Sequence, residues 1–286
     1  AVGVVAGDKE ICIEKLVADA AANTNHNLNG EDVDPGLLVV TGCIPLGKTK
    51  IKQHSAGEKI VHFIRHAEGH HNVAAAPFER GTEGYLRALS DFRWFDARLS
   101  PTGEEQCKEL NNNTRHLDYD LILVSPLTRT LQTATMGFSA SSSSSSSSPS
   151  FSTSRNTPMV AYEPLRERFG RNPCDNRRSI GDIQKEFPHV NFSLIATNLD
   201  PHSCVEGDCG ERETFEHIDV RIRKFLLFIR DLPQRTIAVV GHSATFSRMF
   251  QAHLKWNVSD GPYRLLNAQM RSVVLVFDST APVTHE

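Results

Sequence analysis

The sequence predicts an α/β fold whose central sheet is mostly parallel. Short apolar runs alternate with amphipathic stretches along the chain, which is the pattern of strands separated by helices. The 286 residues are enough for one large domain or two small ones. A content of 39% hydrophobic and 23% charged residues excludes a fibrous or wholly disordered protein.

Each predicted element has its own signal in the chain. Five apolar runs predict strands, over residues 60–64, 121–124, 159–161, 236–240 and 272–277. A helix is predicted to begin at Ser100 and Pro101, because a serine hydroxyl caps a helix and proline suits its first position. Within residues 211–230 apolar side chains recur at spacings of three and four, which predicts a helix facing the core.

Three stretches are expected to lie outside the core. Residues 1–57 are interpreted as an N-terminal extension, and residues 58–286 as the main domain. An unbroken serine tract at 141–148 cannot offset its ordering entropy by burial, so a disordered surface loop is expected near residues 139–157. Residues 199–210 are interpreted as a second polar loop.

Charge and hydropathy restrict the partners of this chain. A formal net charge of −3 gives no general attraction for nucleic acid or an anionic membrane. No apolar run approaches the roughly 20 residues that span a bilayer. Residues 1–20 lack a secretory signal, and the chain begins with Ala1, so a cytoplasmic location is expected, with an organellar or secreted one open if a targeting peptide was removed. The oligomeric state stays open.

The six cysteines are too sparse for a disulfide scaffold. Cys204 and Cys209 bracket a short acidic loop and could close a small ring. Reduced thiols are the favoured interpretation.

The chemistry-bearing residues follow the ends of three predicted strands. Arg65 and His66 follow the first, Arg129 follows the second within a few residues, and His242 follows the third. Ligands of open α/β sheets bind beyond the carboxyl ends of the strands, so these four side chains can converge. Guanidinium groups bind phosphate oxygens in pairs, and a neutral imidazole can attack phosphorus. The arrangement therefore predicts chemistry on a phosphate ester.

Five motifs in order resemble the histidine phosphatase superfamily, the phosphoglycerate mutase-like proteins. They lie at residues 65–72 (Arg-His-Ala-Glu-Gly-His-His-Asn), 96–103, 125–134, 163–170 and 241–243. Residues 173–179 with 187–193 are similar to plant and fungal members of that family. The resemblance covers about residues 59–278, and Ala67 stands where the family usually has glycine. It implies a three-layer α/β/α sandwich.

The resemblance also implies roles for individual residues. His66 would be the nucleophile that forms a phosphohistidine, and Arg65, Arg129 and His242 would hold the phosphoryl group. Glu167 would be the general acid and base, with Glu163 as the competing candidate. Further contacts to the substrate would come from Asn72, Arg177, Arg178 and Ser243, the two arginines reaching a second anionic group or else simply capping a loop.

The expected activity is hydrolysis of a small phosphorylated metabolite, with no metal or other cofactor. Two alternatives remain: a phosphomutase acting on phosphoglycerate or a related molecule, and a non-catalytic protein that binds phosphorylated ligands. Four histidines at 62, 66, 70 and 71 raise the question of zinc, but no paired cysteines or His-Glu-x-x-His pattern accompany them. We expect His70 and His71 to line the pocket instead.

Overall fold

The computed structural model describes residues 40–45, 58–139, 157–204, 208–256 and 264–277. The predicted serine-rich loop and most of the predicted N-terminal extension lie outside these residues. No helix in the described ranges is long and apolar enough to cross a membrane.

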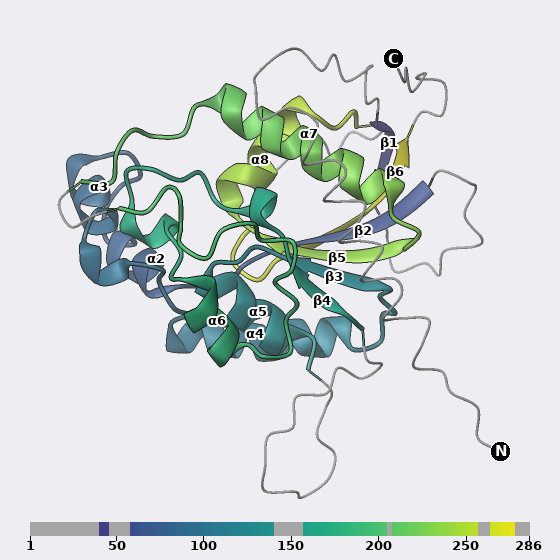
Figure 1. The fold of residues 1–286 in the computed structure, drawn as a ribbon, viewed down its shortest axis with the longest axis horizontal. Helices are drawn as coiled ribbons and strands as arrows, with labels where there is room; N and C mark the ends of the chain where they lie inside the picture. The colour runs from purple at the N-terminus through teal and green to yellow at the C-terminus, as the bar shows by residue number, and fades with distance from the viewer. Residues whose placement is uncertain (1–39, 46–57, 140–156, 205–207, 257–263, 278–286) are drawn as a thin grey trace, which may run out of the picture.

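Six strands form one sheet in the order β1-β6-β2-β5-β3-β4 (Figure 1). They are β1 (Val40–Pro45), β2 (Glu58–Arg65), β3 (Leu121–Val124), β4 (Met159–Ala161), β5 (Thr236–Gly241) and β6 (Met270–Phe277). Neighbours among β2, β5, β3 and β4 pair in parallel, whereas β6 runs antiparallel to both β1 and β2. All five predicted strands are confirmed. Strand β1 is additional, and it comes from within the predicted extension.

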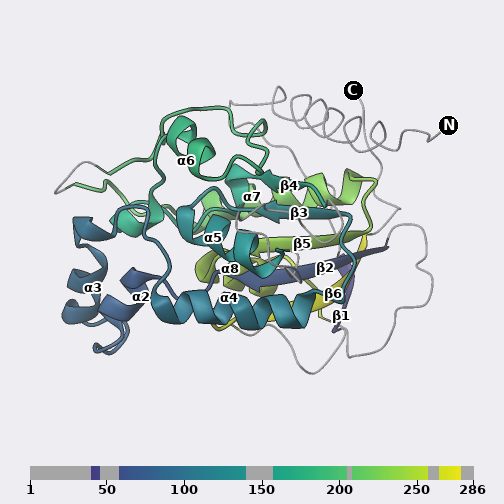
Figure 2. The same cartoon turned by 90° about the horizontal axis from the view of Figure 1, so that it is seen from below.

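Helices cover both faces of the sheet, which confirms the α/β/α sandwich (Figures 1 and 2). Helices α7 (Phe215–Asp231) and α8 (Ser243–Ala252) lie on one face, and α4 (Pro101–Thr114), α5 (Thr128–Gly137) and α6 (Ile180–Glu186) on the other. The remaining short elements are α2 (His70–Ala75), α3 (Glu83–Leu89), η1 (Phe92–Trp94), η2 (Glu163–Leu165) and η3 (Pro173–Asp175).

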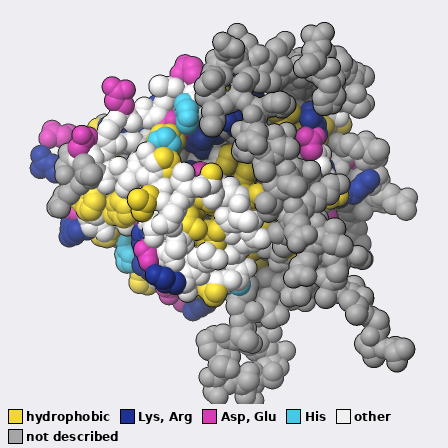
Figure 3. Space-filling view, in the orientation of Figure 1, with side chains coloured by type: hydrophobic (Ala, Val, Ile, Leu, Met, Phe, Trp, Pro, Cys, Tyr) yellow, Lys and Arg dark blue, Asp and Glu magenta, His cyan; other side chains and the backbone are white. Residues whose placement is uncertain are grey.

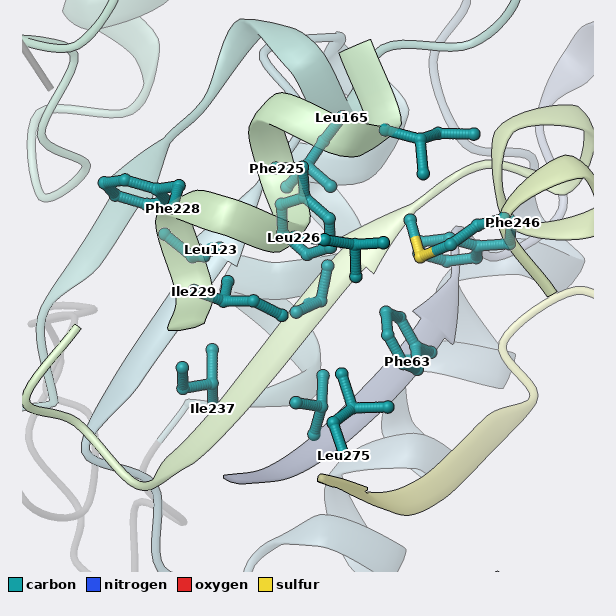
Figure 4. Packing of buried hydrophobic residues seen from close by; sticks show 14 of the residues in the cluster. Phe63, Leu123, Leu165, Phe225, Leu226, Phe228, Ile229, Ile237, Phe246 and Leu275 are labelled. Carbon is teal, nitrogen blue, oxygen red and sulfur yellow. The ribbon is translucent and has the colours of Figure 1, made fainter. Parts of the chain in front are cut away.

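Each face of the sheet carries its own hydrophobic core. Successive strand residues point to opposite faces, so Phe63 packs in the core beneath α7 and α8, while Ile64 packs in the core beneath α4, α5 and α6. Figure 4 shows Phe63 in the first core with side chains of α7, including Phe225 and Leu226. Together the two cores fix the positions of the central strands, and so of their carboxyl ends.

A short polar clamp ties the segment after β2 to the start of α4. Ser100 caps α4 as predicted, its hydroxyl accepting from the Gly103 backbone N–H at 3.0 Å. The Ser100 N–H donates to the Glu68 carbonyl at 2.9 Å. A Cβ on Gly103 would lie 2.1 Å from that carbonyl oxygen, so only glycine permits this approach. The clamp fixes the chain that immediately follows His66.

Cys204 and Cys209 form a disulfide, so the favoured interpretation of this pair as reduced thiols is wrong. On the described part of the face seen in Figure 3, acidic and basic side chains are interspersed. This distribution fits the small net charge of the chain.

Candidate active site

Three adjacent strands deliver the predicted residues to one place. Arg65 ends β2 and pairs in register with Gly241 at the end of β5. His66 and His242 follow directly, and their ring centroids lie 5.2 Å apart. Arg129, in the first turn of α5, lies within electrostatic reach of both imidazoles. The expected convergence of these four side chains is therefore observed.

His66 is held in one tautomer. Its side chain is only 2% exposed, and Nδ1 lies 2.7 Å from the Ala67 carbonyl oxygen. A carbonyl can only accept, so Nδ1 carries the proton. Burial and the charges of Arg129 and Arg65 lower the pKa of His66 well below its usual value, so the ring is neutral near pH 7. Its Nε2 atom consequently has a free lone pair.

His242 is completely buried beside it. Nε2 lies 2.8 Å from the Ser125 hydroxyl, and Nδ1 has no hydrogen-bond partner among the described residues. Burial and then the charge of Arg129 lower the pKa of His242 well below its usual value. The second imidazole is thus also neutral, with one ring nitrogen available.

In both arginines some N–H groups of the guanidinium donate to protein acceptors, and the Nε–H does not. Arg65 donates through Nη1 to the Leu265 carbonyl at 3.1 Å. Arg129 is 1% exposed and donates to the Cys174 carbonyl and, at 3.0 Å, to Asp175 Oδ1. The Nε atoms of both arginines are buried without a partner in the described structure. An anion with several oxygens can supply the missing acceptors.

Glu167 lies at the start of α8, next to His242. Its carboxylate accepts from the backbone N–H groups of Ala244 at 3.1 Å and Thr245 at 3.2 Å. A carboxylate suits a helix N-terminus, where the first N–H groups have no partner in the helix. Glu167 also lies within electrostatic reach of Arg65, whose pKa burial lowers and the Glu167 charge raises. The residue is half-buried, so solvent reaches this edge of the site.

The competing carboxylate, Glu163, is engaged elsewhere. It pairs with Arg166 at 2.9 Å and with Arg177 at 3.2 Å. Arg166 in turn pairs with buried Asp200 at 2.7 Å. Glu163 therefore belongs to an ion-pair network that joins η2 to the loop around residue 200.

Arg177 is wholly enclosed by the protein. Its side chain has no exposed surface, and the guanidinium donates to Glu163 and to the backbone carbonyls of Thr197, Asn198 and Leu199. These bonds give Arg177 a structural role without any contact to a substrate. That role agrees with the alternative interpretation, in which the residue secures a loop.

Arg178 is half-exposed and also paired. It contacts Asp96 at 3.1 Å, Glu186 at 2.9 Å and the Thr128 hydroxyl at 2.8 Å. Asp96 accepts from the Thr128 backbone N–H as well, at 2.8 Å. Arg178 thereby stabilises the turn before α5, the helix that carries Arg129.

Asn72 and Ser243 lie at the edge of the histidine cluster. Asn72 Oδ1 accepts from the Gly69 N–H at 3.0 Å, which holds the start of α2. Ser243 is the first residue of α8, and its hydroxyl accepts from Arg264 Nε at 2.6 Å. Arg264 lies in no sequence motif, so sequence reasoning missed it, and among the described residues it reaches the site through this contact.

The two adjacent histidines of the first motif differ sharply. His70 is exposed and stacks on Trp94, with ring centroids 6.1 Å apart, so the expectation that it lines the pocket is wrong. His71 is 5% exposed, and its ring centroid lies 5.7 Å from that of His66. In the described structure no group of three His, Cys, Asp or Glu side chains is arranged to hold a metal ion.

Comparisons with known proteins agree with these motifs. Residues 61–142 match the histidine phosphatase superfamily (branch 1). An Arabidopsis thaliana "Phosphoglycerate mutase-like protein" is 32% identical over 243 residues, which cover 76% of this chain and 84% of the relative. "Phosphoglycerate mutase-like protein 1" from the same plant is 34% identical over 203 residues, 65% of this chain and 68% of that protein.

Among solved structures, this chain is similar in fold to a putative alpha-ribazole-5'-P phosphatase from Escherichia coli str. K-12 substr. MG1655. The TM-score is 0.43 at 18% sequence identity, over 79% of this chain and 99% of that one.

The environment of His66 predicts its protonation state. At pH 7 we expect a neutral ring with the proton on Nδ1, because burial and two arginine charges disfavour the imidazolium and Ala67 requires a donor. Long-range proton–nitrogen correlation spectra at a series of pH values report both properties. A histidine peptide in the same sample, with a pKa of about 6.5, serves as the reference. An imidazolium at pH 7, or a proton on Nε2, would contradict this description.

Proposed function

The chain belongs to the histidine phosphatase superfamily, and from this premise we propose that it hydrolyses a small phosphorylated metabolite through a phosphohistidine on His66. The observation that carries the proposal is the free lone pair on Nε2 of a neutral His66, placed beside His242 and two guanidinium groups. This arrangement offers a nucleophile and a positively charged cradle to the same tetrahedral anion.

In the first step, Nε2 of His66 attacks phosphorus as the bond from phosphorus to the ester oxygen breaks. The electron pair of that bond stays on the leaving oxygen, and Glu167 gives it a proton. In the second step, Glu167 takes a proton from water, the water oxygen bonds to phosphorus, and the nitrogen–phosphorus bond breaks with its electron pair returning to His66. Free phosphate and the alcohol are the products.

The charge on the phosphoryl oxygens is met by Arg65, Arg129 and His242. Both arginines offer N–H groups that have no acceptor in the described structure. Nε2 of His242 lies 2.8 Å from the Ser125 hydroxyl, and Nδ1 of the same ring has no partner in the described structure. We assign the hydroxyl as the donor to Nε2, which leaves the ring proton on Nδ1 as a further donor to the phosphoryl group. Donors aimed at developing charge in a site shielded from water stabilise the transition state strongly. Asn72 and Ser243 contact the substrate at the edge of this cradle.

Hydrolysis is favoured over transfer within one substrate by two features. Glu167 is half-buried, so water has access beside the proposed phosphohistidine. The arginines first assigned to a second anionic group, Arg177 and Arg178, are bonded to protein acceptors. A mutase must retain its intermediate, but Arg168 and Arg212 beside Glu167 are bonded to protein as well. Arg168 donates to the Glu213 carbonyl at 2.7 Å, and Arg212 donates to the Gly170 carbonyl at 2.8 Å and pairs with Asp175 at 3.3 Å.

Replacing the nucleophile tests the covalent intermediate. His66→Ala should reduce phosphate release by a factor on the order of a thousand or more, because no other group supplies the attacking lone pair. Wild-type protein quenched during turnover of a radiolabelled phosphate ester should carry acid-labile, base-stable label that the variant lacks. His116→Ala, at an exposed position after α4, is the control and should retain both turnover and label. Near-native turnover by the His66 variant would overturn the proposal.

The same protein incubated with 3-phosphoglycerate distinguishes the two reactions. Free phosphate as the main product supports hydrolysis, and 2-phosphoglycerate as the main product establishes a mutase.

Replacing the acid–base carboxylate separates the two chemical steps. A p-nitrophenolate leaving group needs little protonation, so Glu167→Gln should still release a first equivalent of p-nitrophenol rapidly and then turn over slowly, on the order of 100-fold or more below wild type. With glycerol phosphate the variant should also lose the first step. Stopped-flow absorbance measures the burst.

Glu163→Gln is the matched control for this variant. Its carboxylate supports Arg166 and Arg177, so it should lower thermal stability without separating burst from turnover. Wild-type kinetics in Glu167→Gln would contradict its role as the acid and base. The burst pattern in Glu163→Gln would assign that role to Glu163 instead.

A further inference from the structure

His71 is a third imidazole in the cluster, and the mechanism above does not use it. It is the second residue of α2, is 5% exposed, and lies with its ring centroid 5.7 Å from that of His66. Burial, followed by the charges of Arg129 and Arg65, lowers its pKa well below the usual value. The ring of His71 therefore belongs to the same cluster of imidazole and guanidinium groups as His66.

The orientation of the ring is set by Gly69. A Cβ on Gly69 would lie 2.7 Å from both Nδ1 and Cε1 of His71, so this edge of the ring packs directly against the glycine backbone. Nδ1 is buried and finds no hydrogen-bond partner among the described residues. A buried N–H without an acceptor costs free energy, so the proton of the neutral ring is better placed on Nε2.

Nε2 is then the ring nitrogen with which His71 can bind a ligand. A neutral Nε2–H is a donor, and the nearest imidazole, His66, already directs its own Nδ1 proton to Ala67. The positive charges of Arg65 and Arg129 attract an anion to this position. An oxygen of a phosphoryl group has the charge and the lone pairs to serve as the acceptor for this N–H.

We propose that His71 is a further catalytic residue, whose Nε2–H donates a hydrogen bond to a non-bridging oxygen of the phosphoryl group bound at His66. This inference rests on the proposed function, because it assigns the residue to the same phosphoryl site. It distinguishes His71 from His70, whose exposed ring stacks on Trp94 outside the cluster.

Three substitutions at this position separate hydrogen bonding from packing. In His71→Gln the side-chain amide can donate from near the position of Nε2, whereas in His71→Asn the shorter amide reaches only the position of Nδ1. His71→Phe keeps an aromatic ring but has no donor. His70→Gln is the matched control on the neighbouring residue. Thermal unfolding of each variant reports folding, and p-nitrophenyl phosphate turnover together with inhibition by orthophosphate reports the site.

The proposal predicts that His71→Phe and His71→Asn lower kcat/KM by a factor on the order of 100, as for other donors to developing charge, and weaken inhibition by orthophosphate. His71→Gln should recover at least about tenfold of that loss, and His70→Gln should match wild type. Phe or Asn variants within threefold of wild type, or a Gln variant no better than Asn at equal folded stability, would overturn it. Should the Phe variant not fold, the comparison of Gln with Asn decides.

Failure of the proposed function gives a different pattern. If the wild-type protein hydrolyses no phosphate ester, that function falls, and orthophosphate binding by calorimetry tests His71 alone. Equal orthophosphate affinity in wild type, His71→Gln and His71→Asn would then contradict the proposed hydrogen bond from His71 to the anion. Weaker binding in His71→Asn than in His71→Gln would support it.

Discussion

The site depends on keeping imidazoles neutral beside permanent positive charges. His66 and His242 are buried just after β2 and β5, and His71 is buried in the first turn of α2, where loss of water disfavours the protonated forms of all three. The guanidinium groups of Arg65 and Arg129 add to that effect, because a second positive charge nearby is repelled. The result is a set of lone pairs and N–H groups inside a positive field, for which an anion with several oxygens is the complementary ligand.

The fold builds this field through the order of its strands. Since β5 lies next to β2, His242 follows its strand beside His66. Helix α5 begins shortly after β3 on the far side of β5, and it brings Arg129 within electrostatic reach of both imidazoles. Asp175 and the Cys174 carbonyl orient Arg129 without using its Nε. The contact of Gly103 with the Glu68 carbonyl then holds the chain after His66. Backbone contacts and ion pairs thus fix the cradle before any ligand arrives.

Much of this arrangement could be predicted from the sequence. The strands are short apolar runs, and the rule that ligands bind at strand ends brought Arg65, His66, Arg129 and His242 together. Choosing between adjacent histidines was beyond sequence reasoning, because α2 has only six residues and no apolar periodicity to show which side of it is buried. Arg177 looked available for substrate, since its acceptors come from backbone carbonyls at residues 197–199. Arg264 and β1 depend on tertiary contacts that no local pattern reveals. The spacing of Cys204 and Cys209 allowed a small disulfide ring but could not decide between the bonded and the reduced pair.

A crystal structure of the protein with orthovanadate tests the central claim most directly. Vanadate copies the geometry of a phosphoryl group in transfer, so we predict vanadium within bonding distance of Nε2 of His66. Its oxygens should accept from Arg65, Arg129 and Nδ1 of His242, at about 2.7–3.2 Å. Vanadate bound elsewhere, or a His66 ring with Nδ1 rather than Nε2 toward the ligand, would contradict the account.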